Sequence, residues 1–182
     1  MPDPPAKSDP SFLPPPRVVT LRDGRPYLIR PLAPGDEDRL IAFFSSHTLE
    51  TIRQRYGYLI KYMSAERAHK LVDLDPRREV ALGVLENDGL KDVIHAVGRL
   101  VVAEDGHKAE VAFVVRETKR RIGMATTLLR VLLRIARQRR LDSAFAQVQA
   151  DNVPMLIVFR RAGENFTEEQ NGDIVEVTIP LE

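Results

Sequence analysis

The sequence predicts a mixed α/β fold in which a central, mostly antiparallel sheet carries helices on both faces. A chain of 182 residues with 43% hydrophobic residues is long enough to bury the core of one domain. Strand-like apolar runs bounded by turn sequences alternate with stretches whose apolar residues recur at helical spacing. Three such strands in a row precede a single strand–helix–strand crossover, and this order mixes antiparallel with parallel neighbours.

The chain opens with a segment of different character. Residues 1–16 hold seven of the thirteen prolines and predict an extended tail, so the single folded domain covers residues 17–182. Val18–Leu21 and Tyr27–Arg30 flank the sequence RDGRP, and an Asp-Gly pair between apolar runs is typical of a two-residue hairpin turn. Pro26 limits pairing close to that turn.

Helices are predicted next. Leu40, Ile41, Phe43 and Phe44 recur at helical spacing, and two short helices begin at hydroxyl residues, over Thr48–Tyr58 and Ser64–Val72. The remaining predicted elements are strands over Glu79–Leu85, Val93–Ala103 and Lys108–Val115, a helix over Gly123–Arg139, a strand over Ser143–Gln149, a helix over Val153–Arg161 and a strand over Ile174–Ile179.

Composition narrows the function classes. Because the chain has no cysteine, it offers no disulfide, thiolate nucleophile or cysteine-ligated metal, which is compatible with a reducing cytosol. No apolar run approaches the roughly 20 residues that cross a bilayer, and no secretion signal opens the chain. The four histidines show no metal-ligand spacing. We expect a soluble, cytoplasmic protein with no metal site and no membrane partner.

The net charge of +1 argues against a protein that coats nucleic acid, although a local basic surface stays open. Arg130, Arg134 and Arg137 fall on one face of a predicted helix, with Arg139 and Arg140 beyond it. Such a row fits docking to nucleic acid or to an acidic protein, but charged rows are usually solvated. Nucleic acid is therefore the less favoured partner.

The stretch RRIGMATTLLR, residues 120–130, sets two arginines and a glycine before a strongly apolar helix. The first turn of a helix has unpaired N–H groups and a partial positive charge, so Gly123 lets an anion such as a phosphate approach the backbone. The stretch lacks the Lys-Ser or Lys-Thr pair of a P-loop and the three glycines of the dinucleotide fingerprint. The alternative is a glycine that only begins a helix, beside solvated arginines.

Arg120-x-x-Gly123-x-Ala125, after the strand AEVAFVV, resembles the Gln/Arg-x-x-Gly-x-Gly/Ala signature of the GNAT acetyltransferase superfamily. The block ADNVPMLIVFRRAG, residues 150–163, is similar to a second block of that superfamily, and TLRDGRPYLIRPLAPGDED resembles its first strand and helix. More narrowly, LETIRQRYGY and LVDLDPRREVAL are similar to the acetyltransferase domain of bacterial protein lysine acetyltransferases.

The resemblance implies a GNAT fold that uses acetyl-coenzyme A as cosubstrate and needs no metal. In this superfamily a strand edge holds the pantetheine arm and the next loop holds the pyrophosphate, mostly through backbone N–H groups. An asparagine also contacts the arm, although helix capping explains Asn152 equally well. The cofactor-binding residues implied are Phe113, Val114, Val115, Arg120, Arg121, Ile122, Gly123, Met124, Ala125, Thr126 and Asn152.

The narrower resemblance implies that Glu110 is the general base, because those relatives carry a glutamate on the fourth strand. An amine must be neutral to attack a thioester, yet a free lysine, with a pKa of about 10.4, is almost wholly protonated at neutral pH. A carboxylate can accept that proton directly or through a water. A strand N–H, such as that of Val114, would polarise the acetyl carbonyl. Taken without the resemblance, a strand glutamate is more often a solvated or structural residue.

Phe159 departs from the pattern, because many GNAT enzymes have a tyrosine there that protonates the leaving thiolate. The resemblance therefore implies an N-acetyltransferase, with a catalytically weak or inactive acyl-coenzyme A sensor as the alternative. The acceptor is an amine, either a protein lysine or a small molecule. Its identity, the preferred acyl group and the presence of a homodimer stay open.

Overall fold

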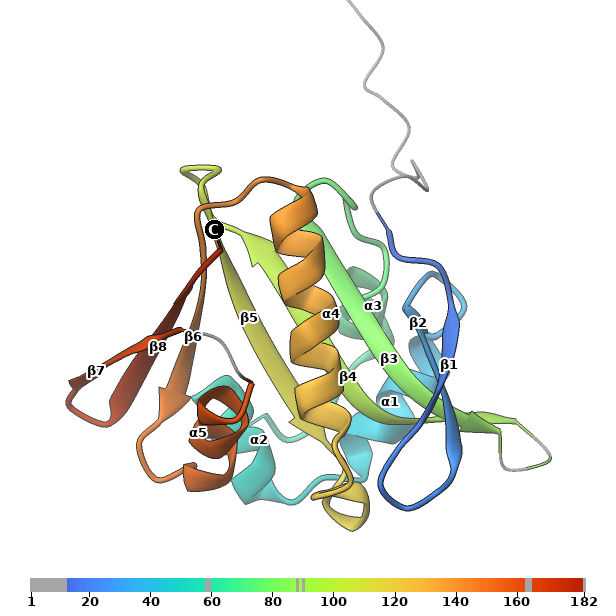
Figure 1. Cartoon of the computed structure of the whole chain (residues 1–182). Helices are drawn as coiled ribbons and strands as arrows, with labels where there is room; N and C mark the ends of the chain where they lie inside the picture. Colours follow the sequence, from blue (N-terminus) through green and yellow to red (C-terminus); the bar gives the residue numbers. More distant parts are fainter. Residues whose placement is uncertain (1–12, 58–59, 88, 90, 163–164, 182) are drawn as a thin grey trace, which may run out of the picture.

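The computed structural model describes residues 13–57, 60–87, 89, 91–162 and 165–181 (Figure 1). Eight strands form one sheet in the order β1-β2-β3-β4-β5-β6-β8-β7, and each neighbouring pair is antiparallel except β5 and β6. The strands are β1 Arg17–Thr20, β2 Pro26–Pro31, β3 Glu79–Asn87, β4 Asp92–Val102, β5 Lys108–Val115, β6 Ser143–Gln149, β7 Thr167–Asn171 and β8 Ile174–Pro180. The predicted mixed α/β class, with its mostly antiparallel sheet, is confirmed.

Helices cover both faces of the sheet. Figure 1 shows α4 lying across the near face, with α1 to α3 behind the sheet. The helices are α1 Glu37–Ser45, α2 Leu49–Tyr56, α3 Ala65–Lys70, α4 Met124–Gln138 and α5 Val153–Arg160, with a short 3₁₀ turn, η2, over Glu117–Lys119. The Thr48 and Ser64 side chains cap α2 and α3 as predicted, each accepting a hydrogen bond from a backbone N–H three residues on.

Each face has its own apolar core. Under α4 and α5 lies the larger one, in which four leucines of α4 are completely buried: Leu128, Leu129, Leu132 and Leu133. Between the sheet and α1 to α3 lies the smaller one, which includes Leu40, Phe43, Phe44, Ile52 and Met63. The sheet is therefore buried on both sides, and this explains why β3 and β4 are apolar along most of their length.

Three local predictions need correction. The turn between β1 and β2 has five residues rather than two, because the ladder already ends at Thr20 paired with Pro26. The strand β7 was missed, since its sequence TEEQN is polar and wholly exposed and shows no apolar alternation. The helix α2 stops before Gly57, which has a left-handed φ of 76°; Tyr58 of the predicted helix lies outside the described residues.

Of the predicted tail, residues 1–12 lie outside the described residues. Leu13 is partly buried against the larger core, and residues 14–16 form no helix or strand before β1 begins. The last residues of the proline-rich segment are thus in contact with the folded domain. The extended tail itself stays a prediction.

Packing of α4 can be tested with two substitutions on the same helix. Leu132 is 0% exposed, whereas Arg134 faces solvent. Leu132→Ala removes buried methyl groups and leaves a cavity, so we expect a loss of about 2–5 kcal/mol in the free energy of unfolding. Arg134→Ala should stay within about 0.5 kcal/mol of the parent. Urea unfolding measures both, and equal losses would contradict the burial of this face.

Candidate functional site

The sheet opens at the only parallel pair of strands among the described residues. Lys108–Glu110 of β5 pair with Ser143–Phe145 of β6, and beyond Glu110 no further register joins the two strands. Figure 1 shows β5 and β6 diverging toward the end of the molecule where α4 begins. The last five residues of β5 therefore have a partner strand on one side only.

The register of β5 determines which of its backbone groups are paired. The Arg116 N–H donates to the His95 carbonyl at 2.8 Å, on the β4 side. Hydrogen-bonded and non-bonded pairs alternate along an antiparallel ladder, so Val114, opposite Val97, is also hydrogen-bonded to β4. Its N–H is consequently directed away from the gap.

Phe113 and Val115 have the opposite orientation. Because they lie one residue out of step with Val114, their N–H and C=O groups point to the side from which β6 has departed. This corrects the choice of Val114 as the N–H that polarises a carbonyl. The Phe113 side chain is buried against α4, so only its backbone is turned to the gap.

The loop that follows β5 leads into the first turn of α4, and residues 121–126, where the two meet, are called the helix mouth below. Gly123 is the N-cap of α4 with a φ of 102°, and no side chain of the described residues caps the first turn. A Cβ atom added at Gly123 would meet nothing within 4 Å, so the backbone is accessible there. Arg121 also has a positive φ, 66°, which costs a non-glycine residue roughly 1–2 kcal/mol. Such a strained, uncapped turn is the arrangement that anion sites use.

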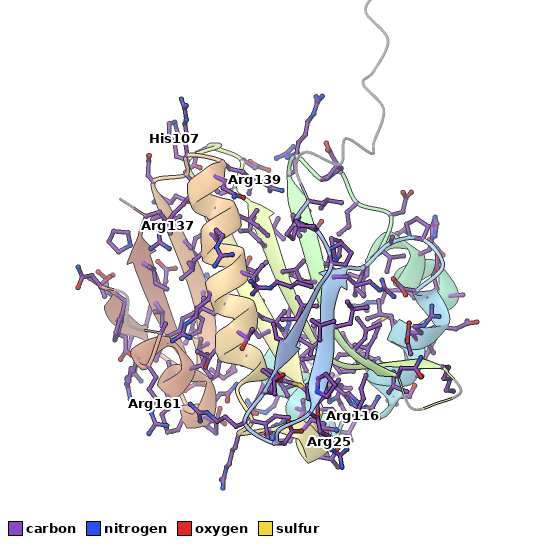
Figure 2. The ribbon with its side chains drawn as sticks, turned by 45° about the vertical axis from the view of Figure 1, so that its right-hand side comes forward. Arg25, His107, Arg116, Arg137, Arg139 and Arg161 are labelled. Atoms are coloured by element: carbon purple, nitrogen blue, oxygen red, sulfur yellow. The ribbon has the colours of Figure 1, made fainter. Side chains whose placement is uncertain are left out.

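Side chains at this mouth divide into two groups. Met124 and Ala125 are buried, so their side chains pack in the core and only their backbone can meet a ligand. Arg120 turns toward α2 and donates to the Thr51 hydroxyl at 2.7 Å, whereas Arg121 is exposed. Figure 2 places Arg25, Arg116 and Arg161 at the end of the molecule where α4 begins, and Arg25 forms an ion pair with Glu86 there.

The arginine row on α4 is less continuous than the sequence indicates. Arg130 and Arg134 are exposed, but Arg139 donates to the carbonyls of Pro76 and Arg77 before β3. In Figure 2 Arg137 and Arg139 lie at the opposite end of the helix from the mouth. Arg139 therefore holds a loop in place.

A cavity of about 40 Å³ lies in the gap between β5 and β6. Asn152 lines it and also caps α5, accepting from the Met155 N–H at 3.4 Å, so the two interpretations of this residue are compatible. Phe159 lines it as well; its ring is 1% exposed and lies 6.1 Å from the Phe113 ring, centroid to centroid. No hydroxyl is present at that position.

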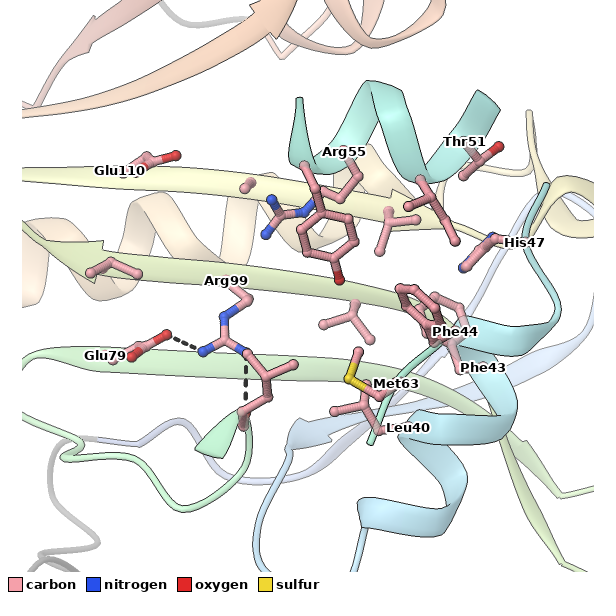
Figure 3. A pocket seen from close by; sticks show the side chains of 17 residues that line it. Leu40, Phe43, Phe44, His47, Thr51, Arg55, Met63, Glu79, Arg99 and Glu110 are labelled. Carbon is pink, nitrogen blue, oxygen red and sulfur yellow. Dashed lines mark hydrogen bonds and ion pairs between the residues drawn. The ribbon is translucent and has the colours of Figure 1, made fainter. Parts of the chain in front are cut away.

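A larger cavity, of about 300 Å³, lies on the α1–α3 face of the sheet (Figure 3). Its apolar end is formed by Leu40, Phe43, Phe44 and Met63, and the figure shows Arg55 and Arg99 between this end and the two carboxylates Glu79 and Glu110. Glu110 and Arg55 line both cavities. These two side chains therefore stand where the gap in the sheet meets the larger cavity.

Glu117, in the loop between β5 and α4, forms hydrogen bonds to the start of α2. Its carboxylate accepts hydrogen bonds from the Thr51 hydroxyl at 2.6 Å and from the backbone and side chain of Thr48 at 3.0 and 3.1 Å. Burial opposes the ionisation of Glu117, but these hydrogen bonds outweigh it and hold its pKa at about 2. The start of α2 is thereby fixed to the loop that leads into α4.

His47 lies beside this cluster and lines the larger cavity. Its Nδ1 is 3.3 Å from the Glu117 carboxylate, and its buried Nε2 has no hydrogen-bond partner among the described residues. Burial lowers the pKa of His47, with Glu117 acting in the opposite direction. A neutral ring that donates from Nδ1 leaves an accepting Nε2 at the cavity wall.

Five further residues of the site were not predicted from the sequence: Arg55, Glu117, His47, Arg99 and Glu79. The sequence signal for Glu117 was its place directly after a strand and before the glycine mouth. For Arg55 there was none, since it is one of two arginines in a short amphipathic helix.

Among the described residues, no three His, Asp or Glu side chains gather as metal ligands. None of the helices in the described part is long and apolar enough to span a bilayer.

Comparisons with known proteins bear on the family and the fold. Residues 27–165 match the family model described as acetyltransferase (GNAT) domain. The acetyltransferase PA5475 of Pseudomonas aeruginosa is 27% identical over 140 residues, which are 76% of this chain and 74% of that protein. The GNAT domain of S. lividans PAT superposes with a TM-score of 0.81 at 27% identity, covering 91% of this chain and 97% of that chain.

A more distant structure shares the fold. The spermidine N-acetyltransferase of Vibrio cholerae, in complex with CoA and spermine, has a TM-score of 0.66 at 17% identity and covers 84% of this chain and 94% of that chain.

The hydrogen bonds of Glu117 to Thr48 and Thr51 should make a pH-dependent contribution to the free energy of unfolding. A carboxyl whose pKa falls from 4.5 to about 2 on folding stabilises the folded state above pH 4.5, and that stability is lost as pH falls toward 2. Glu117→Gln should cost about 1–2 kcal/mol at pH 7, and this cost should shrink between pH 4.5 and 3. Urea unfolding at each pH measures it. The exposed control Glu104→Gln should show little cost at any pH, and a constant Glu117→Gln cost from pH 7 to 3 would contradict the linkage.

Proposed function

This chain belongs to the GNAT acetyltransferase family, and from that premise we propose that it transfers the acetyl group of acetyl-coenzyme A to an amine, with Glu110 as the general base. The observation that carries the proposal is the position of Glu110. It lies on β5 at the last residue paired with β6, and its side chain borders both the gap and the larger cavity.

The gap and the helix mouth fit coenzyme A. The Phe113 and Val115 backbone groups face the gap and are suited to a pantetheine amide, and the uncapped first turn of α4 is suited to the pyrophosphate. Ile122 to Thr126 would make these contacts through the backbone, with Arg121 adding charge. The superfamily role of Arg120 is placed in doubt by its bond to Thr51, which turns its side chain toward α2.

The reaction then needs three events around Glu110. Its carboxylate takes a proton from the acceptor ammonium, directly or through a water, and leaves a neutral amine. The amine nitrogen forms a bond to the acetyl carbon while the carbon–sulfur bond breaks and the thiolate leaves. The second proton of the amine nitrogen passes to solvent water or, through water, to the departing thiolate, which leaves a neutral amide. The negative charge that develops on the carbonyl oxygen is stabilised by a backbone N–H, for which Phe113 has the required direction.

Phe159 supports a second candidate function. The leaving group is the coenzyme A thiolate, which is chemically similar to a cysteine thiolate, whose thiol has a pKa of about 8.5. It therefore leaves without prior protonation more readily than an alkoxide does. A positioned general acid is nevertheless worth about a hundred-fold or more in rate. Because the Phe159 ring offers no donor in the gap, a slow enzyme or a sensor that only binds acyl-coenzyme A is the alternative.

The acceptor is either a protein lysine or a small amine. The resemblance of LETIRQRYGY and LVDLDPRREVAL to bacterial protein lysine acetyltransferases supports the lysine. The spermidine N-acetyltransferase, which has the same fold, keeps a small amine as the alternative acceptor.

If coenzyme A binds at the helix mouth, a substitution at Gly123 should abolish the thermal shift that coenzyme A causes, whereas the same substitution at a matched glycine should not. Coenzyme A should raise the melting temperature of the protein by mass action. Gly123→Val places a branched side chain where the pyrophosphate would approach, so its own ligand-induced shift should fall to near zero. Gly106 also has a positive φ and open surroundings but lies in the β4–β5 turn. Gly106→Val should keep the full shift, and a full shift in folded Gly123→Val would sink the assignment.

The base assignment predicts a pH-dependent defect. Glu110→Gln keeps the shape of the side chain but cannot accept a proton, so turnover should fall about a hundred-fold or more, with part of it recovered at high pH where more amine is neutral. Calorimetry should find unchanged acetyl-coenzyme A binding, and Glu104→Gln should retain full turnover.

Two other outcomes have distinct meanings. Equal, robust turnover by the parent and Glu110→Gln would reject Glu110 as the base. Acetyl-coenzyme A binding by both proteins, with no acetylation across a wide panel of amines, would establish the sensor instead.

A further inference from the structure

The larger cavity contains one cation that forms no ion pair with a carboxylate of the described residues. Arg99 is occupied on both sides, since it forms an ion pair with Glu79 and donates to the Leu71 carbonyl at 3.1 Å. Arg55 differs. It lines the cavity and is partly buried, its guanidinium lies 4.9 Å from the centre of the Tyr56 ring, and no carboxylate of the described residues is within ion-pair distance.

This unpaired charge is held at a cost. Burial lowers the pKa of Arg55; Tyr56 and Glu110 act in the opposite direction, and the neighbouring Arg99 adds repulsion. Once Glu110 has accepted a proton from the substrate, the cavity retains one net positive charge, because Arg99 and Glu79 offset each other. A polyamine would bring further positive charge to this place, whereas an anionic group on the substrate would neutralise it.

The arrangement also fixes where each part of a ligand fits. Glu110 and Arg55 both border the gap, so an amine at the first and an anion at the second lie close together on one molecule. Figure 3 shows the apolar side chains Phe43, Phe44 and Met63 beyond Arg55. A volume of about 300 Å³ is that of a small-molecule site.

We propose that the acceptor is an amino acid with an apolar side chain: its amine faces Glu110, its carboxylate binds the Arg55 guanidinium, and its side chain enters the apolar end of the cavity. The planar guanidinium matches the two oxygens of a carboxylate, which favours a carboxylate over a single-point hydrogen-bond acceptor. This inference rests on the proposed acetyl transfer and names its substrate class.

The test compares acceptors that differ only in the carboxylate. Acetyl transfer is measured with L-phenylalanine against phenethylamine and with L-leucine against 3-methylbutylamine, and spermidine and a lysine peptide complete the panel. A charged hydrogen-bonded pair is worth about 1.5–3 kcal/mol, so the parent should prefer each amino acid by about 10- to 150-fold in kcat/KM. Arg55→Gln should bring this ratio close to one, mainly by raising KM for the amino acids.

Two control variants sharpen the comparison. Arg55→Lys keeps the charge without the planar fork and should retain part of the preference. Arg134→Gln removes the same charge from the exposed face of α4 and should leave the ratio unchanged. The inference is overturned if the parent favours the decarboxylated amines, spermidine or the lysine peptide, or if Arg55→Gln leaves the preference intact.

Failure of the transfer proposal is distinguished by a binding measurement. Should no amine be acetylated, calorimetry of the coenzyme A-bound protein with L-phenylalanine and phenethylamine still reports on Arg55. Binding of the amino acid that is lost in Arg55→Gln would uphold carboxylate recognition in a non-catalytic protein. Absence of amino-acid binding to the parent would reject it.

Discussion

The divergence of β6 from β5 after Glu110 is the constraint on which the site depends. A strand inside a sheet normally satisfies its backbone groups on both sides, and a buried strand that cannot do so loses about 1–3 kcal/mol for each unpaired group. Phe113 and Val115 face this situation on the β6 side. A ligand with amide groups, such as a pantetheine arm, can supply the missing partners, so the same feature that weakens the empty sheet favours the bound one.

The helix α2 connects the two halves of the site. Its first turn is held by Glu117, which belongs to the loop between β5 and α4, and Arg120 of that loop donates to Thr51 of the helix. Its second half carries Arg55 into the larger cavity. The binding of an anion at the helix mouth and the binding of an acceptor near Arg55 therefore both depend on the position of α2. Loss of order at one of these places is transmitted to the other through this helix.

Much of the fold was predictable because its signals are local. The apolar periodicity of α4, the hydroxyl caps Thr48 and Ser64, and the strand β5 depend on neighbouring residues along the chain, and each was found where it was predicted. The strand β7 has no apolar side chain and forms only because β8 offers an edge beside it. Its Asn-Gly turn at residues 171–172 was the available sequence signal.

The same distinction between local and tertiary signals applies to the site. Gly123 and Glu110 could be placed because each stands at a fixed distance from a recognisable motif. The direction of the Val114 N–H could not, because it depends on whether even or odd residues of β5 pair with β4, and a register of this kind is a tertiary property. The role proposed for Arg55 was harder still to predict from the sequence. It depends on the ion pair between Arg99 and Glu79, which lie on two other strands. A sequence shows which charges a chain carries, but only the fold shows which of them lines a cavity without an ion-pair partner, and a buried charge of this kind is unfavourable unless a ligand supplies the partner.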